Sequence, residues 1–139
     1  MGEVGTNTTW NGGRTIAAHE PGMVGGVSAV HLLAGTIVSG GWDATLRTWN
    51  RQDGNLQSTT STSTWVYGIA PCPSSHSEDF VLVASTGGMY PNPMELLRVF
   101  NLKKGTCEVA LVGHRRGVHG VRVRGDWAAS GSKDSIQLW

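Results

Sequence analysis

The chain has 139 residues, the length of one ordinary domain, and only 15% of them are charged. With 11 Lys and Arg against 10 Asp and Glu, its net charge is +1. This balance excludes an acidic tail and argues against nucleic acid as a partner. Twenty glycines and many Thr, Ser and Val residues favour short strands joined by turns over long helices.

The cysteine content and the hydropathy of the sequence indicate in which cellular compartment we expect the protein. The two cysteines, Cys72 and Cys107, lie far apart and lack neighbours at metal-ligand spacing, so neither a disulfide framework nor a zinc site is expected. Cys72 and His76 supply only two potential ligands, which favours a surface loop. The sequence contains no long apolar run and no signal peptide. We therefore expect a cytoplasmic or nuclear protein with no membrane contact, no metal and no cofactor.

Short alternating strands recur along the chain and end in an aromatic residue. The intervals between these aromatics are 39 residues from Trp10 to Trp49, 51 to Phe100 and 39 to Trp139. Three repeats follow, approximately 11–49, 50–100 and 101–139. The predicted strands are 14–18, 27–32, 36–40, 45–49, 59–64, 65–70, 80–85, 95–100, 107–112, 118–123, 127–131 and 135–139.

The middle repeat is longer than its neighbours by two predicted loops. Residues 71–79 and 87–94 are rich in Pro, Gly or Ser, as insertions at turns usually are. The hydroxyl-rich run 58–64 is interpreted as an outer strand, with a disordered or phosphorylated segment as the alternative.

Three segments carry a resemblance to a known family. They are Gly113-His114, the run from Ser130 to Trp139, and the run from Val38 to Trp49. The chain resembles the WD-repeat family over nearly its whole length, and we take 1–139 as one WD-repeat region. The resemblance implies an all-β fold of β-propeller blades, each with four antiparallel strands, in a partial propeller of three blades.

The resemblance also implies a hydrogen-bonded network of His, Ser, Asp and Trp within a blade. The matching positions are His19, Ser39, Asp43 and Trp49 in the first repeat, and His114, Ser130, Asp134 and Trp139 in the third. Trp139 follows Asp134 by five positions, whereas Trp49 follows Asp43 by six. In a strand this shift turns Trp139 to the opposite face, unless the preceding turn is shorter or the strand is bulged.

The second repeat lacks such a network. Phe100 replaces the tryptophan, and no turn Asp lies in 87–94. We expect apolar packing to take over the stabilising role. The residues predicted to supply it are Val66, Ile69, Val81, Val83, Leu97 and Val99.

A Ser, a His and an Asp together also resemble a hydrolytic triad. No G-x-S-x-G elbow surrounds Ser39 or Ser130, and the set recurs in two repeats, so a structural role is favoured. Phosphate loops, dinucleotide fingerprints and H-E-x-x-H motifs are absent from the sequence. We expect a protein that is not an enzyme, with a propeller-based hydrolase or lyase as a distant alternative.

Candidate partner-binding residues lie in loops that a propeller opens on one face. They are Trp42, Tyr90, Arg115, Arg116 and Lys133. Trp42 either anchors a partner or folds back on its own repeat. The three cations either hold a phosphate or carboxylate of a peptide, or form a solvated rim.

These features predict a non-catalytic scaffold that presents loops to partner proteins or peptides. The alternative is a phosphopeptide-binding or degron-binding module in ubiquitin ligation, although the sequence contains no F-box. Three blades are too few to close a ring, because propellers usually have about 4–8. We therefore expect the remaining blades to come from a longer chain or from self-assembly.

Overall fold

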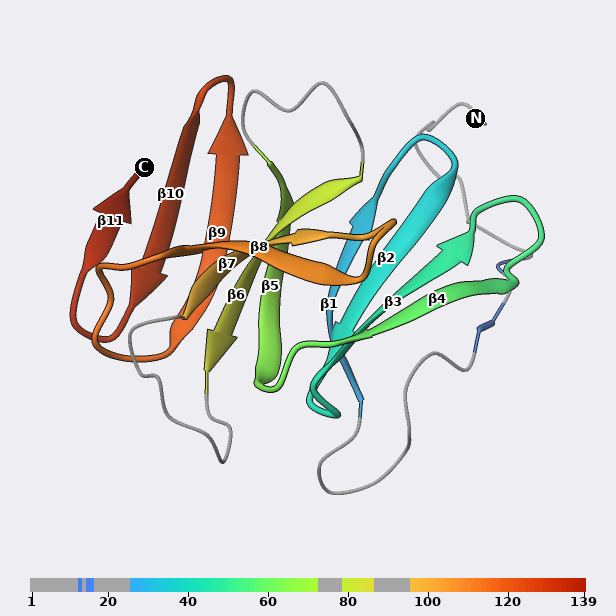
Figure 1. Cartoon of the computed structure of the whole chain (residues 1–139), viewed down its shortest axis with the longest axis horizontal. Helices are drawn as coiled ribbons and strands as arrows, with labels where there is room; N and C mark the ends of the chain where they lie inside the picture. The colour runs from blue at the N-terminus through green and yellow to red at the C-terminus, as the bar shows by residue number, and fades with distance from the viewer. Residues whose placement is uncertain (1–12, 14, 17–25, 73–78, 87–95) are drawn as a thin grey trace, which may run out of the picture.

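The computed structural model describes residues 13, 15, 16, 26–72, 79–86 and 96–139, and their regular structure is all-β. The strands form three antiparallel sheets, which lie side by side in chain order (Figure 1). The predicted all-β class is confirmed. The strand predicted over 14–18 is not formed at Thr15 and Ile16, and its other residues lie outside the described ones.

Sheet 1 contains β1 (Val27–Leu32), β2 (Thr36–Gly41), β3 (Thr45–Asn50) and β4 (Leu56–Ser61). Sheet 2 contains β5 (Trp65–Pro71), β6 (Phe80–Thr86), β7 (Leu97–Asn101) and β8 (Thr106–Leu111). Sheet 3 contains β9 (Val118–Arg124), β10 (Trp127–Ser132) and β11 (Ile136–Leu138). Each sheet is a simple meander, in which every strand pairs with the next along the chain.

The sheets are offset by one strand from the sequence repeats. The strand predicted to open the second repeat, 59–64, is found as β4 and pairs with β3 of sheet 1. The strand predicted to open the third repeat, 107–112, is found as β8 and pairs with β7 of sheet 2. The outer strand of each four-stranded sheet is therefore supplied by the next repeat.

Two apolar clusters fill the spaces between the sheets. The first joins Val38 and Leu46 of sheet 1 to Val66, Ile69, Val81, Val83 and Phe100 of sheet 2. The second joins Ala70, Leu82, Ala84 and Leu97 of sheet 2 to Val118, Val121 and Ala128 of sheet 3. The predicted apolar packing of the second repeat is thus confirmed, with Val99 partly buried against the second cluster. Each sheet is covered on the face toward its neighbour.

The first strands of the three sheets are adjacent, since β1 contacts β5 and β5 contacts β9. The turns after β2 and β10 and the linkers after β4 and β8 lie along the lower edge in Figure 1. Loops far apart in sequence therefore share one edge of the molecule. Among the described residues, no helix has the length and apolarity needed to cross a membrane.

Candidate functional site

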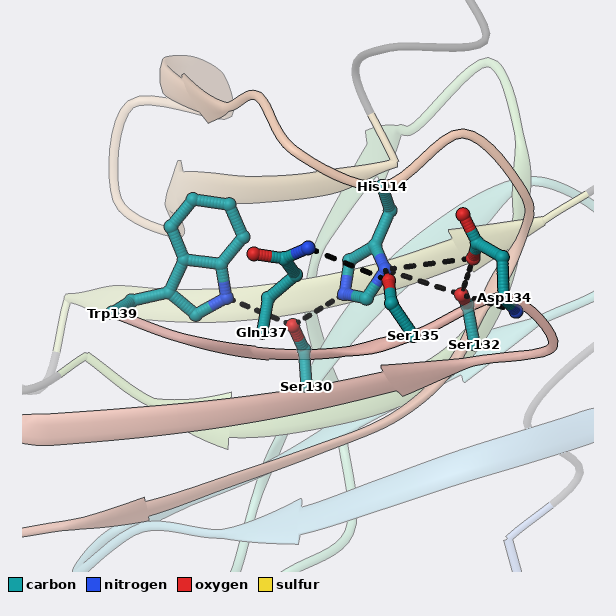
Figure 2. Close-up of polar contacts among 7 residues, drawn as sticks. All are labelled: His114, Ser130, Ser132, Asp134, Ser135, Gln137 and Trp139. Carbon is teal, nitrogen blue, oxygen red and sulfur yellow. Dashed lines mark hydrogen bonds and ion pairs between the residues drawn. The ribbon is translucent and has the colours of Figure 1, made fainter.

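The polar network of sheet 3 runs from the end of the chain to the turn after β10 (Figure 2). Trp139 Nε1 donates to Ser130 Oγ at 2.8 Å, and that hydroxyl lies 2.7 Å from His114 Nε2. On the other side of the imidazole, Nδ1 lies 3.1 Å from Ser132 Oγ, which donates to Asp134 Oδ1. If the imidazole carries its proton on Nδ1, each donor in this hydrogen-bonded network has an acceptor.

A shorter turn keeps Trp139 in the network. Ser39 pairs with Arg47 across a turn of three residues, 42–44, whereas Ser130 pairs with Gln137 across a two-residue turn. In both hairpins the tryptophan therefore follows the residue opposite the serine by two positions, and its indole reaches that serine. The missing residue is absorbed by the turn, and the side chain does not change face.

The carboxylate of Asp134 is held in its charged form. Donation from the Ser132 hydroxyl lowers the pKa of Asp134 below its ordinary value of 3.8, and the backbone N–H groups of Asp134 and Arg115 act in the same direction against partial desolvation. His114 Nδ1 lies 4.0 Å from Asp134 Oδ1, so Ser132 bridges the two groups. The network therefore fastens the linker after β8 to the turn after β10.

Burial decides how this Ser–His–Asp set can act. Ser130 is 2% exposed and His114 is 1% exposed, and the serine oxygen already accepts the indole proton. A nucleophile must reach its substrate, and the orienting acid must hydrogen-bond the imidazole directly. This set meets neither condition, and its hydrogen bonds join the linker after β8 to β10 and Trp139. We call it the polar clamp.

Sheet 1 repeats part of this arrangement. Trp49 Nε1 donates to Ser39 Oγ at 2.9 Å. Asp43 accepts from the backbone N–H of Thr45 at 3.2 Å and from its hydroxyl at 2.8 Å, and it lies 3.6 Å from the Arg47 guanidinium. Asp43 therefore closes the turn after β2. His19, the fourth predicted member, lies outside the described residues.

Sheet 2 holds a buried cation that the sequence reasoning missed. Val83 and Phe100 occupy the register positions that Ser39 and Trp49 have in sheet 1, so a polar pair is replaced by an apolar one. Arg98, only 9% exposed, donates to Thr62 O at 2.7 Å and to Thr64 Oγ1 at 2.5 Å. Its guanidinium also lies 5.1 Å from the centre of the Phe100 ring. Arg98 ties the linker after β4 to sheet 2.

Aromatic rings from all three sheets form a continuous row. Trp42, in the turn after β2, stacks on Trp65 of β5 with ring centres 5.9 Å apart and lies 5.7 Å from Tyr67. Tyr67 in turn meets His119 of β9 edge-on at 5.1 Å. Trp42 thus packs against rings of sheet 2, and 39% of its surface stays exposed. We call Trp42, Trp65, Tyr67 and His119 the aromatic row.

A hollow of about 400 Å³ opens beside the aromatic row. Its lining consists of Gly26, Val27, Ser28, Trp42 and Tyr67. The backbone N–H of Trp42 donates to Gly26 O at 3.3 Å, which fixes the turn at the rim. The site therefore combines an exposed ring face with a concave neighbour, as peptide-binding surfaces often do.

The predicted cations lie at one end of the same edge. Arg115, Arg116 and Lys133 are exposed, in the linker after β8 and the turn after β10. The acid Asp134 lies among them and accepts the backbone N–H of Arg115. Tyr90 lies outside the described residues.

No protein-family model matches this sequence, and no curated protein sequence matches it either. The assignment of fold and function is therefore based on the residues and geometry of this chain alone.

The remaining titratable groups form no further centre in the part of the chain that is described. Cys72 and Cys107 are free thiols, and burial raises the pKa of Cys72. His76, considered beside Cys72 as a ligand, lies outside the described residues. Among those that are described, no three His, Cys, Asp or Glu side chains converge as metal ligands would.

Proposed function

We propose that this chain is a non-catalytic protein-interaction module of the WD-repeat type, whose sheets are blades of a partial propeller. The 39-residue period, the Ser-to-Trp bonds in sheets 1 and 3 and the adjacency of β1, β5 and β9 support this arrangement. The module binds a peptide segment of a partner protein at the aromatic row. Two free cysteines agree with a cytoplasmic or nuclear setting.

The exposure of Trp42 is the observation that carries this proposal. A tryptophan in a polar turn gains most by burial, yet Trp42 keeps 39% of its surface open although Trp65 and Tyr67 hold its ring in place. Its ring is preorganised, so little side-chain entropy is lost when a partner covers it. Tryptophan is also among the residues that dominate binding energy in protein interfaces.

The ligand that suits this edge is a peptide with an apolar anchor and flanking acidic residues. The apolar side chain enters the hollow beside Trp42 and Tyr67. Acidic neighbours reach the exposed Arg115 and Lys133, where rim charges add association rate and specificity more than affinity.

Phosphopeptide recognition is a weaker candidate. Asp134 stays ionised among the three cations and reduces the positive potential that a phosphate needs. A hydrolase or lyase is weaker still, because Ser130 and His114, the would-be nucleophile and base among the described residues, are both buried. Neither alternative has an observation of its own that favours it.

Selection from a random peptide library, followed by binding measurements on the selected peptides, tests the proposal. Trp42→Ala should weaken binding by about 30-fold, the cost of losing an interface anchor. Trp127→Ala is the matched control, because Trp127 is also exposed but lies at the opposite edge, beside the turn after β9. Equal affinities for the wild type and Trp42→Ala would reject the aromatic row as the binding site.

A further inference from the structure

The three sheets stack in one repeated manner, which leaves two matching faces uncovered. We call the face of a sheet that contacts the following sheet its front, and the face that contacts the preceding sheet its rear. The front of sheet 1 covers the rear of sheet 2, and the front of sheet 2 covers the rear of sheet 3. Within the described residues, the rear of sheet 1 and the front of sheet 3 have no sheet against them.

Register-equivalent residues show that the rear of sheet 1 is built like a covered face. Val27, Val66 and Val118 hold the same position at the start of the first strand of their sheets. Val66 and Val118 are both 0% exposed, but Val27 is 47% exposed. The next rear position holds Val30, which is 57% exposed, where sheet 2 has the buried Ile69. On the neighbouring strands, Val27, Val66 and Val118 lie opposite Gly41, Ser85 and Ser132, respectively. In the same way, Val30 lies opposite Ser39 and Ile69 lies opposite Val83.

The front of sheet 3 shows the same contrast. Leu46 and Leu97 are 1% and 0% exposed at a position that pairs with Gly40 and Ala84 respectively. Ile136 has the equivalent position, paired with Gly131, and is 83% exposed. An isoleucine at this place follows the pattern of a packed face, although nothing in the described chain packs on it.

Two glycines identify the partner that fits. A Cβ on Gly40 would lie 2.3 Å from Val66 Cγ1 and 3.2 Å from Ile69 Cδ1, so the front of sheet 1 leaves room for the rear of sheet 2. Gly131 holds the same register position in sheet 3, and a Cβ there meets nothing within 4 Å. Gly131 therefore provides the space that Val27 and Val30 require, and these valines lie on the free rear of the same chain.

We propose that two copies of this chain associate front to rear, with Gly131 and Ile136 of each copy packed on Val27 and Val30 of the other. Sheets 3 and 1 are the two ends of the row in Figure 1, so their free faces cannot cover one another within one copy. Two copies supply six sheets, within the range of about 4–8 blades that close a propeller. Both contacts in this ring are front-to-rear and identical. The proposal does not rest on peptide binding, although Val27 belongs both to this interface and to the lining of the hollow beside the aromatic row.

Sedimentation of the purified 139-residue chain tests this pairing. The wild type should be a dimer at tens of micromolar. Ile136→Asp on the front and Val30→Lys on the rear should each raise the dissociation constant at least about 10-fold, because each buries an unpaired charge. Val109→Asp is the matched control, since Val109 is exposed on β8 of sheet 2, away from both free faces.

Mixing the two variants distinguishes front-to-rear pairing from a symmetric patch. One contact in the mixed pair is wild type, and the other sets the introduced carboxylate beside the introduced ammonium, so a dimer should return on mixing. A monomeric wild type, a dimer unaffected by either substitution, or variants that stay monomeric when mixed would each overturn the proposal. Far-ultraviolet circular dichroism of both variants verifies that they remain folded, as their exposed positions predict.

Discussion

The substitution Ser130→Ala should destabilise sheet 3 more than the loss of one small polar group suggests. The Ser130 hydroxyl serves His114 Nε2 at 2.7 Å and Trp139 Nε1 at 2.8 Å. Removing it leaves two polar groups without that partner, and each buried unsatisfied group costs about 1–3 kcal/mol. Because His114 is fully buried and Trp139 only partly, we expect a loss of about 2–4 kcal/mol in the free energy of unfolding.

Urea denaturation followed by tryptophan fluorescence measures this loss. With a slope of about 2 kcal/mol per molar urea, the midpoint should fall by about 1–2 M. Ser135→Ala is the matched control, because Ser135 Oγ contacts the same imidazole only at 3.3 Å and Ser132 remains beside it. Its effect should stay below about 1 kcal/mol. Equal midpoints for the two variants would refute the clamp as described.

A double-mutant cycle isolates the contribution of the hydrogen bond from Trp139 Nε1 to Ser130 Oγ to the free energy of unfolding. Trp139→Phe removes the donor, so the cost of Ser130→Ala should be smaller in that background by about 1 kcal/mol. Additive effects would show that the indole bond contributes nothing beyond packing.

Three further predictions concern other parts of the molecule. Gly40→Ala should cost about 1–3 kcal/mol by overpacking against Val66, whereas Gly35→Ala, with open space around it, should be nearly neutral in thermal denaturation. Arg98→Leu should cost about 1.5–3 kcal/mol, and hydrogen exchange should show faster opening of the linker after β4. The folded state lowers the pKa of Asp134, so its stabilising effect is present above the ordinary value of 3.8 and is lost as the pH falls through the folded pKa. Asp134→Asn should therefore weaken the acid dependence of stability, and an unchanged pH profile would contradict this.

Local patterns were sufficient to place most strands. The prediction of 27–32 matches β1 residue for residue, because alternating apolar residues lie between two glycine-containing turns. The hydroxyl-rich run is a strand only at its start, since β4 ends at Ser61 and Thr62–Thr64 form the linker. A run of Ser and Thr has no periodicity that could mark this boundary.

Assignment of strands to sheets could not be obtained from the repeat alone. A period of 39 residues can be divided at any strand, and only the observed pairing shows that β4 joins β3 instead of β5. The spacing of Trp139 was ambiguous for a similar reason. Its face depends on the length of the turn after β10, which the residue count alone does not determine.

The candidate site was only partly foreseeable. The sequence marks Trp42 as an unexpected aromatic in a turn, but its packing on Trp65 and Tyr67 depends on how sheets 1 and 2 meet. The sequence does not indicate the burial of Arg98, because a single charged residue in a strand usually faces solvent. The linker after β4 buries Arg98, and no local sequence pattern indicates this contact.

The indole N–H resonances of the tryptophans, recorded while a selected peptide is added, show which rings the peptide covers. Trp42 and Trp65 lie in the aromatic row, whereas Trp49 and Trp139 donate to buried serines. If the aromatic row is the binding site, the resonances of Trp42 and Trp65 should shift and saturate with the peptide, while those of Trp49 and Trp139 stay in place. Shifts confined to other tryptophans, with Trp42 unchanged, would contradict binding at the aromatic row.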